Sequence, residues 1–246
     1  MLKTYAEDFL IRQSCADMGG TWRPSAVLEA MQETAATHCE HLGLGRKELD
    51  ARGVAWVLSR THVELDRLPA IGARVNVETY PLPLKHMFFP RVNTFRDETG
   101  AVIGRAASLW VLIDLETRRI VQDDYVLSRL PDNSDLDAPA VLPATVRPLP
   151  GEAREFELTA QYTEYDMNGH VNNARYLDWC CNALGLEALR ERAIRAFDVN
   201  YDAEVRPGTI LTASLTRVGD RFTFTGTAEG KRRFAVSGAL APREGR

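Results

Sequence analysis

Cysteine is scarce in this sequence of 246 residues, which has four, at positions 15, 39, 180 and 181. None of them forms the Cys-x-x-Cys spacing that is usual in zinc sites and redox motifs. The adjacent Cys180 and Cys181 are also poorly placed for a routine disulfide. The sequence therefore predicts reduced cysteines that lie mostly in the core.

Long apolar runs and an excess of positive charge are missing as well. The longest strongly apolar run, at 109–113, is far below the roughly 20 residues that span a bilayer. The N-terminal segment, MLKTYAEDFLIRQ, is too charged for a secretory signal. Lysine and arginine number 30 against 34 aspartates and glutamates, a net charge of −4, which argues against a dedicated nucleic-acid binder. We expect a cytoplasmic protein with no membrane span and no nucleic-acid partner.

The composition that is present, 45% hydrophobic and 26% charged, is typical of a globular protein and excludes disorder, collagen and coiled coil for the whole chain. Between Pro131 and Gly151 lie five of the twelve prolines, with no helical or strand periodicity. We interpret residues 131–150 as a linker between one domain at 1–130 and another at 151–246.

The two parts are similar to each other. A shift of 149 residues places 17–22 (DMGGTW) on 166–171 (DMNGHV), and a helical pattern follows each segment. Pro24 suits the first turn of one helix, and Asn172 or Asn173 could cap the other. The apolar faces are expected at 27, 28, 31, 35 and 38 in the first helix and at 176, 177, 180, 181 and 184 in the second.

Alternation of apolar and polar residues predicts the strands. They are expected at 54–65, 74–80, 88–96 and 102–113 in the first copy, and at 155–162, 197–201, 209–217, 221–228 and 233–240 in the second. Each half would contain a strand, a long helix and a run of antiparallel strands. A single helix is buried only if the sheet curls round it, so we expect an α+β fold with one sheet shared by both copies.

The densest polar cluster is 166–173, DMNGHVNN. Asp17 matches Asp166, but Gly19 and Thr21 stand where Asn168 and His170 stand in the second copy. A turn that needed these two side chains for its structure should have them in both copies. The asymmetry favours a chemical role for Asn168 and His170.

The cluster also has structural and metal-binding interpretations. Asp166 and Gly169 could be turn formers only, because Asp, Asn and Gly dominate turns. A calcium loop fails, since Val171 and Leu177 occupy the positions that need Gly and an acidic ligand. We expect no metal. The remaining histidines, at 38, 41, 62 and 86, are expected at the surface or core edge, and Cys180 and Cys181 in the core.

The cluster, followed by an aromatic-rich helix, closely resembles the C-terminal half of acyl-ACP thioesterases of plants and bacteria. The first half resembles the same family at 28–36 (LEAMQETAA) and 56–67 (WVLSRTHVELDR) with Pro69. The resemblance covers most of the chain. It implies a tandem hotdog fold, in which a curled antiparallel sheet wraps each central helix.

Carried over by motif, the family's catalytic Asp, Asn and His fall on Asp166, Asn168 and His170. Its catalytic Glu falls on Glu204, in the segment 199–205 (VNYDAEV). Val205 stands where plant members often have a Cys, so a Cys-His mechanism at that position is excluded. Leu68 occupies the place of Glu204 in the first copy, which suggests that only the second half is catalytic.

The resemblance implies hydrolysis of fatty acyl-ACP to a free fatty acid, ending chain elongation in fatty acid biosynthesis. Asn168 would polarise the carbonyl and orient water, helped by backbone N–H groups at the start of the next helix. Asp166 or Glu204 would be the base or nucleophile, and His170 would shuttle protons. Two carboxylates in a dry pocket should raise the pKa of one of them.

The first domain would hold the acyl chain, with Val27, Leu28, Met31 and Asn173 as the expected substrate-binding residues. No cofactor is expected, and a homodimer is compatible with the resemblance. Acyl carrier protein is acidic, so its docking face should be locally basic. Two basic clusters in the sequence are candidates for that face: Arg190, Arg192 and Arg195, or Lys231, Arg232 and Arg233.

Three rival functions differ from this one in the sequence features or the substrate that they require. An acyl-CoA thioesterase would differ in its carrier. A hotdog hydratase or dehydratase would add or remove water across a carbon-carbon bond, whereas Asn168 and its context favour hydrolysis. A fatty-acyl binding module would have no use for a polar cluster that occurs in the second half only.

Overall fold

The computed structural model describes residues 1–138 and 141–243. Residues 139–140 of the expected linker and 244–246 of the expected second domain lie outside the described residues.

The two halves repeat one order of elements. The first half contains β1 (Tyr5–Leu10), η1 (Gln13–Cys15), α1 (Pro24–His41), α2 (Arg46–Asp50), β2 (Val54–Leu65), β3 (Arg74–Pro81), β4 (Phe89–Arg96), β5 (Val102–Asp114) and α3 (Asp124–Arg129). The second half contains β6 (Ala153–Thr159), η2 (Tyr162–Glu164), α4 (Arg175–Leu184), α5 (Leu186–Glu191), β7 (Arg192–Tyr201), β8 (Ile210–Val218), β9 (Arg221–Ala228) and β10 (Lys231–Pro242). Each half thus has a strand, a long central helix and four further strands.

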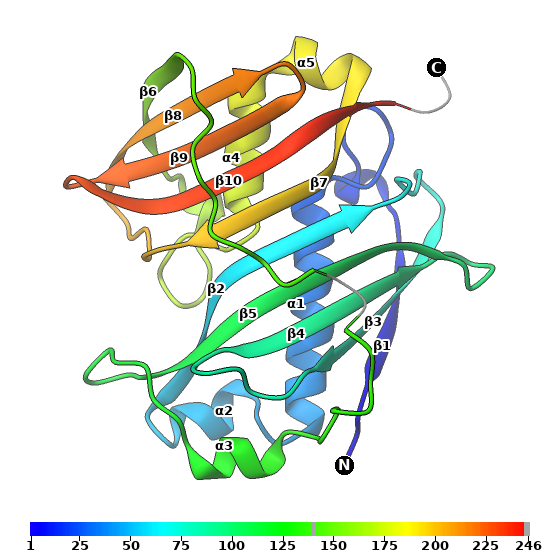
Figure 1. Ribbon diagram of the computed structural model, residues 1–246, viewed down its shortest axis with the longest axis vertical. Helices are drawn as coiled ribbons and strands as arrows, with labels where there is room; N and C mark the ends of the chain where they lie inside the picture. Colours follow the sequence, from blue (N-terminus) through cyan, green and yellow to red (C-terminus); the bar gives the residue numbers. More distant parts are fainter. Residues whose placement is uncertain (139–140, 244–246) are drawn as a thin grey trace.

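All ten strands form one antiparallel sheet in the order β1-β3-β4-β5-β2-β7-β10-β9-β8-β6 (Figure 1). The order is symmetric about the β2–β7 pair, where Thr61 lies opposite Val199. β2 and β7 are the strands that follow the central helix of each half. The sheet shared by two copies, expected from the sequence, is confirmed.

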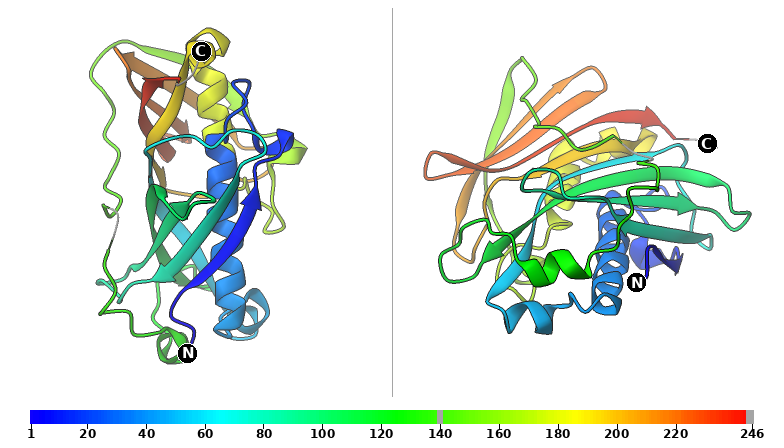
Figure 2. Two further views of the ribbon diagram at one scale, coloured as in Figure 1. Left: turned by 90° about the vertical axis from the view of Figure 1, so that its right-hand side faces the viewer. Right: turned by 60° about the horizontal axis from the view of Figure 1, so that its bottom comes forward.

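The central helices α1 and α4 pack on the same face of this sheet, and the segment that joins the halves runs over the opposite face (Figure 2). The fully buried residues Trp22 and Phe95 of the first half and Leu177 and Phe234 of the second belong to one continuous apolar core. On the other face, Val146 N donates to Asn200 Oδ1 at 2.7 Å. The α+β class predicted from the sequence is therefore correct.

The expected strands agree with the structure except in two places. β6 ends at Thr159 rather than at 162, because Gln161 and Glu164 form a capping box around η2. β7 begins at Arg192 rather than at 197, because its first residues pair with the end of β10. That pairing is tertiary and leaves no local pattern in the sequence. The short helices α2, α3 and α5 were not predicted.

The start of one central helix agrees with the prediction, and the start of the other does not. α1 begins at Pro24, as expected from the missing N–H of proline. The prediction that Asn172 or Asn173 caps α4 is wrong, because the N-cap residue is Ala174. Asn172 Oδ1 instead accepts from Ala174 N at 2.9 Å, one turn before the helix. Among the described residues, no helix combines the length and the apolar character needed to cross a membrane.

Candidate active site

The polar cluster forms a tight turn. Asp166 N donates to His170 O at 3.0 Å, and Gly169 N donates to Asp166 O at 3.0 Å. Asp166 Oδ1 accepts a hydrogen bond from Asn168 N at 2.8 Å, and this side-chain-to-backbone bond stabilises the turn. Gly169 has φ of 77°, a left-handed conformation that glycine adopts without steric cost. The turn therefore presents Asn168 and His170 from one short segment.

The first copy folds into the same turn. Asp17 N donates to Thr21 O at 2.8 Å, and Gly19 N donates to Asp17 Oδ1 at 2.9 Å. Gly20 has φ of 75°. The aspartate therefore has a structural role in both copies, whereas the groups at Asn168 and His170 are absent from the first. This agrees with the alternative that Asp166 forms the turn, and it does not remove its carboxylate from the site.

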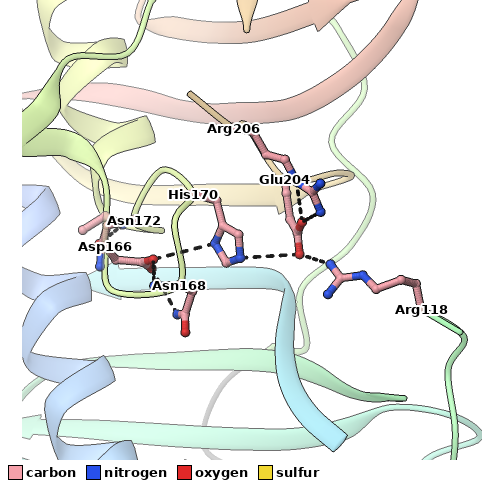
Figure 3. A network of polar contacts seen from close by, with 8 residues as sticks. Arg118, Asp166, Asn168, His170, Asn172, Glu204 and Arg206 are labelled. Carbon is pink, nitrogen blue, oxygen red and sulfur yellow. Dashed lines mark hydrogen bonds and ion pairs between the residues drawn. The ribbon is translucent and has the colours of Figure 1, made fainter. Parts of the chain in front are cut away.

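The turn brings His170 between two carboxylates (Figure 3). His170 Nδ1 lies 3.8 Å from Asp166 Oδ1, and His170 Nε2 lies 3.5 Å from Glu204 Oε1. Asn168 Nδ2 donates to Asp166 Oδ2 at 3.4 Å. All four residues singled out in the sequence lie together. The two imidazole distances exceed those of good hydrogen bonds, which is common in catalytic groups without bound substrate.

Glu204 reaches His170 because two loops are joined. The loop after β7 carries Glu204 and then Val205. The carbonyl of Val205 accepts a hydrogen bond from Val171 N, in the turn, at 2.9 Å. Val205 is fully buried. The backbone hydrogen bond and the buried side chain of Val205 fix the position of the neighbouring Glu204 relative to the turn.

Two arginines bind Glu204 from the side opposite His170. Arg206 Nη2 and Nε lie 3.0 and 3.3 Å from Glu204 Oε2, and Arg118 bonds Oε1 (Figure 3). Burial alone would raise the pKa of Glu204, but the hydrogen bonds from Arg206 and Arg118 and the charge of His170 lower it overall. The expected rise of a carboxylate pKa is therefore wrong for Glu204, because the two arginines were not foreseen.

Arg118 and Arg206 are the site residues that sequence reasoning missed. Arg118 belongs to the turn after β5 in the first half, 86 residues before Glu204. It has a positive φ of 58°. Arg206 follows Glu204 by two residues and could have been noticed from that spacing. No sequence signal indicates Arg118, since only the packing of the halves brings it there.

A cavity of about 300 Å³ opens beside the turn and runs into the first half. Met167 and Asn168 lie at one end of its lining. Much of the rest is apolar and comes from α1, α2 and the first-half strands, with Leu44, Leu49, Val54, Trp56 and Phe89 among the lining residues. An acyl group whose carbonyl is at Asn168 could extend its chain into this space.

A second cavity, of about 20 Å³, shares Gln32, Ala35, Arg91 and Trp110 with the larger one. Leu28, Met31 and Asn173, three of the four expected substrate-binding residues, line it. The fourth, Val27, is fully buried in the core and lines neither cavity. Asn173 also accepts at its carbonyl from Tyr201 Oη at 3.0 Å.

Among the described residues, no cysteine bonds Asp166, Asn168, His170 or Glu204, although Cys39 lines the larger cavity. Burial raises the pKa of Cys180, and it raises the pKa of Cys181 to about 12. All four cysteines are free thiols. A thiolate nucleophile has no source near the described site residues.

The turn of the first copy is closed by Arg243. Arg243 Nη2 lies 2.6 Å from Asp17 Oδ2, and Arg243 Nη1 lies 3.1 Å from Thr21 Oγ1. A side chain at position 19 would collide with the Arg243 guanidinium. Gly19 therefore leaves room for the Arg243 guanidinium at the position where Asn168 stands in the other copy. Arg243 thus bonds the turn of the first copy, whereas Asn168 of the second turn lines the 300 Å³ cavity.

Family models and curated proteins match this chain over most of its length. A model described as "Acyl-ACP thioesterase N-terminal domain" matches residues 2–127, and one described as "Acyl-ACP thioesterase C-terminal domain" matches 149–233. The chain is 26% identical over 240 residues to oleoyl-acyl carrier protein thioesterase 2 of Arabidopsis thaliana, covering 87% of this chain and 63% of that protein. It is 28% identical over 232 residues to the palmitoyl-acyl carrier protein thioesterase of Cuphea hookeriana, covering 86% and 54%. Both relatives are chloroplastic.

Solved structures share the fold. An acyl-ACP thioesterase from Bacteroides thetaiotaomicron superposes with a TM-score of 0.86 at 24% identity, covering 97% of this chain and 98% of that one. The 12:0-ACP thioesterase from Umbellularia californica gives a TM-score of 0.84 at 23% identity, covering 98% of both chains. The tandem hotdog fold expected from the sequence is confirmed.

Proposed function

Because this chain belongs to the acyl-ACP thioesterase family, we propose that it hydrolyses the thioester of fatty acyl-ACP and releases a free fatty acid. The main observation that supports this proposal is the position of His170 between Asp166 and Glu204, beside a largely apolar cavity. The chain spans 63% and 54% of the length of the two plant relatives. In this proposal the activity ends chain elongation in fatty acid biosynthesis.

The proposed reaction uses His170 as the group that moves the proton. A water attacks the thioester carbonyl carbon and transfers its proton to His170, whose protonated ring is stabilised by ionised Glu204. Asn168 donates to the developing oxyanion. When the carbon-sulfur bond breaks, the leaving thiolate takes the proton from His170. Water and thioester have then become carboxylic acid and thiol, with atoms and charge balanced.

The proposed role of Asp166 is to hold the other side of His170 and to position Asn168. Its Oδ1 already accepts from Asn168 N and lies 3.8 Å from His170 Nδ1. Glu204 is too strongly held by Arg118 and Arg206 to be a good proton acceptor, since these contacts lower its pKa. A carboxylate that stays ionised is well suited to stabilise an imidazolium ring.

We propose the same division of labour that the sequence suggested. Residues 1–130 would hold the acyl chain and 151–246 would carry the catalytic groups, with 131–150 as the linker. The large cavity supports this, because it begins beside Asn168 and is otherwise lined mostly by first-half residues. Arg118 qualifies the division, since it brings a first-half side chain to Glu204.

Acyl carrier protein is the proposed partner, and its docking face stays a prediction. In one candidate patch Arg192 pairs with Asp220, and Arg195 donates to Asp66 O at 3.0 Å. In the other, Arg232 pairs with Asp202 at 2.6 Å and Arg233 with Glu229 at 2.9 Å. These pairs reduce the net positive charge that either patch offers. The homodimer and the cytoplasmic location also stay predictions.

The decisive test is thiol release from matched acyl-ACP and acyl-CoA substrates. We expect turnover of acyl-ACP, and a Glu204→Gln variant should lose about 10² to 10⁴ fold in kcat/KM. Asp166→Asn should also slow turnover, and Asp17→Asn, the equivalent change in the first copy of that turn, is its matched control and should keep its activity. Faster turnover of acyl-CoA would indicate the CoA enzyme. Hydration of an enoyl thioester without thiol release would indicate a hydratase, and binding without turnover a binding module.

A further inference from the structure

Polar side chains form a row on the sheet beneath α1. Arg91 of β4 lies directly opposite Ser108 of β5, and Ser108 lies directly opposite Thr61 of β2. All three line the 20 Å³ cavity, together with Asn93, which is two residues beyond Arg91 on the same face of β4. The helix side of this cavity is mainly apolar. The space is therefore a slot with one apolar wall and one polar wall.

Arg91 is a buried cation without a carboxylate partner among the residues that the structure describes. The bonds of its guanidinium go to an imidazole, a hydroxyl and a sulfur: Nη1 lies 3.1 Å from His38 Nδ1 and 3.4 Å from Thr79 Oγ1, and Nη2 lies 3.6 Å from Cys39 Sγ. His38 is neutral at pH 7, since burial and then the charge of Arg91 lower its pKa to about 4. The expectation that His38 lies at the surface or core edge is wrong, because this residue is fully buried.

Two other residues that line the cavities have buried donor groups that, unlike Arg91, make no hydrogen bond to any described residue. Asn93 is 1% exposed, and its Nδ2 makes no hydrogen bond within the described chain. The indole Nε1 of Trp56, which lines the larger cavity, is likewise buried and unbonded to any described residue. Asn93 and the Arg91 guanidinium therefore present buried donors to the slot, and Trp56 presents one to the larger cavity. Buried donors without acceptors are unfavourable, and a plain alkyl chain offers them nothing.

We infer that the preferred substrate is an acyl thioester whose chain carries a hydrogen-bond-accepting oxygen. The small cavity has room for about one water-sized group and shares Gln32, Ala35, Arg91 and Trp110 with the cavity that reaches Asn168, so an oxygen on a chain in the larger cavity can enter it. A hydroxyl, keto or carboxylate oxygen on that chain would accept from Arg91 and Asn93. Ala35 of α1, which lines both cavities, would pack against the methylene groups. This inference rests on the proposed thioesterase function and names its substrate class.

The test compares acyl-ACP substrates of equal chain length that are unsubstituted, hydroxylated or keto-substituted at successive positions, or carboxylated at the far end. We expect one oxygenated series to be preferred over the unsubstituted chain by about tenfold or more in kcat/KM, because a site built for a polar group discriminates strongly against its absence. Asn93→Leu and Arg91→Met should each bring this ratio close to one. Thr94→Val, the next residue of β4 with its side chain on the other face, should leave the ratio unchanged.

A binding measurement separates this inference from the proposed function. Trp56 and Trp110 line the larger cavity, so tryptophan fluorescence should respond when the corresponding free fatty acids bind. Tighter binding of the oxygenated acid by the wild type, lost in Asn93→Leu, supports the inference even if no thioester is hydrolysed. Turnover of all substrates with preference for the unsubstituted chain, unchanged in both variants, overturns the inference and leaves the thioesterase intact. In that case the polar row holds ordered water.

Discussion

His62 and Asp198 face each other across the junction of the two halves, with His62 Nδ1 2.9 Å from Asp198 Oδ1. They are direct partners in the pairing of β2 with β7. They are also equivalent positions of the two copies, since a shift of 136 residues carries the first onto the second. The axis that relates the halves therefore passes through this pair. At this point the repeat has one histidine and one aspartate in place of two identical residues.

The pair predicts a pH-dependent contribution to stability. The hydrogen bond to Asp198 outweighs burial and raises the pKa of His62 above its ordinary value near 6.5. A raised histidine pKa stabilises the fold fully below the unfolded pKa, and this contribution is lost as pH rises through the folded pKa. We expect the free energy of unfolding, from urea titrations, to fall by up to about 1 kcal/mol above pH 6.5 for this reason.

His62→Gln should remove this dependence, and His41→Gln, at an exposed position of α1, is the matched control. The informative quantity is the difference in pH slope between each variant and the wild type, since other groups titrate in all three proteins. Equal slopes in wild type and His62→Gln would show that the pair adds nothing.

The parts of the structure that could be predicted are those whose signal is local. The bounds of β2 were predicted to the residue, because an apolar run at 54–58 leads into alternating burial at 61–65. The turn at Asp166 was recognisable because its sequence pattern occurs twice, as DMGGTW at 17–22 and DMNGHV at 166–171. The early start of β7 and the presence of Arg118 beside Glu204 depend on segments far apart in sequence. Periodicity and turn propensity carry no information about such contacts.

The arginines on Glu204 predict a shift in the pH profile of hydrolysis. In the proposed mechanism Glu204 must be ionised, so the rate falls as pH drops through its pKa. Arg206→Met removes a group that lowers this pKa, so the acid limb of kcat/KM should move to higher pH. Arg12→Met, an exposed arginine that makes no bond to the site, should leave the limb in place. An identical profile for Arg206→Met would mean that another group sets the acid limb.

The cavities predict which helix positions control chain length. Ala35 lines both cavities, whereas Val27 lies on the same helix in the core and lines neither. Ala35→Leu should shift the preference of the enzyme toward shorter acyl chains, because the added carbons occupy the space of the substrate chain. The measurement is kcat/KM across a series of acyl-ACP lengths. Val27→Leu controls for altered core packing and should leave the order of preference unchanged, and a common shift in both variants would contradict the acyl site.

The contact between Arg243 and Asp17 predicts that a charge pair stabilises the turn of the first copy. Its side chain is 7% exposed and that of Asp17 is 20% exposed, so the two groups are largely removed from water. Arg243→Met leaves the Asp17 carboxylate without its partner and should lower the free energy of unfolding by about 1–3 kcal/mol. If the pair alone causes this loss, adding Asp17→Asn to the variant should restore part of it in a double-mutant cycle. Thioester hydrolysis at the second copy should stay close to wild type throughout. Gain of a second active site in Arg243→Met is not expected, because Gly19 and Thr21 supply neither an amide nor an imidazole.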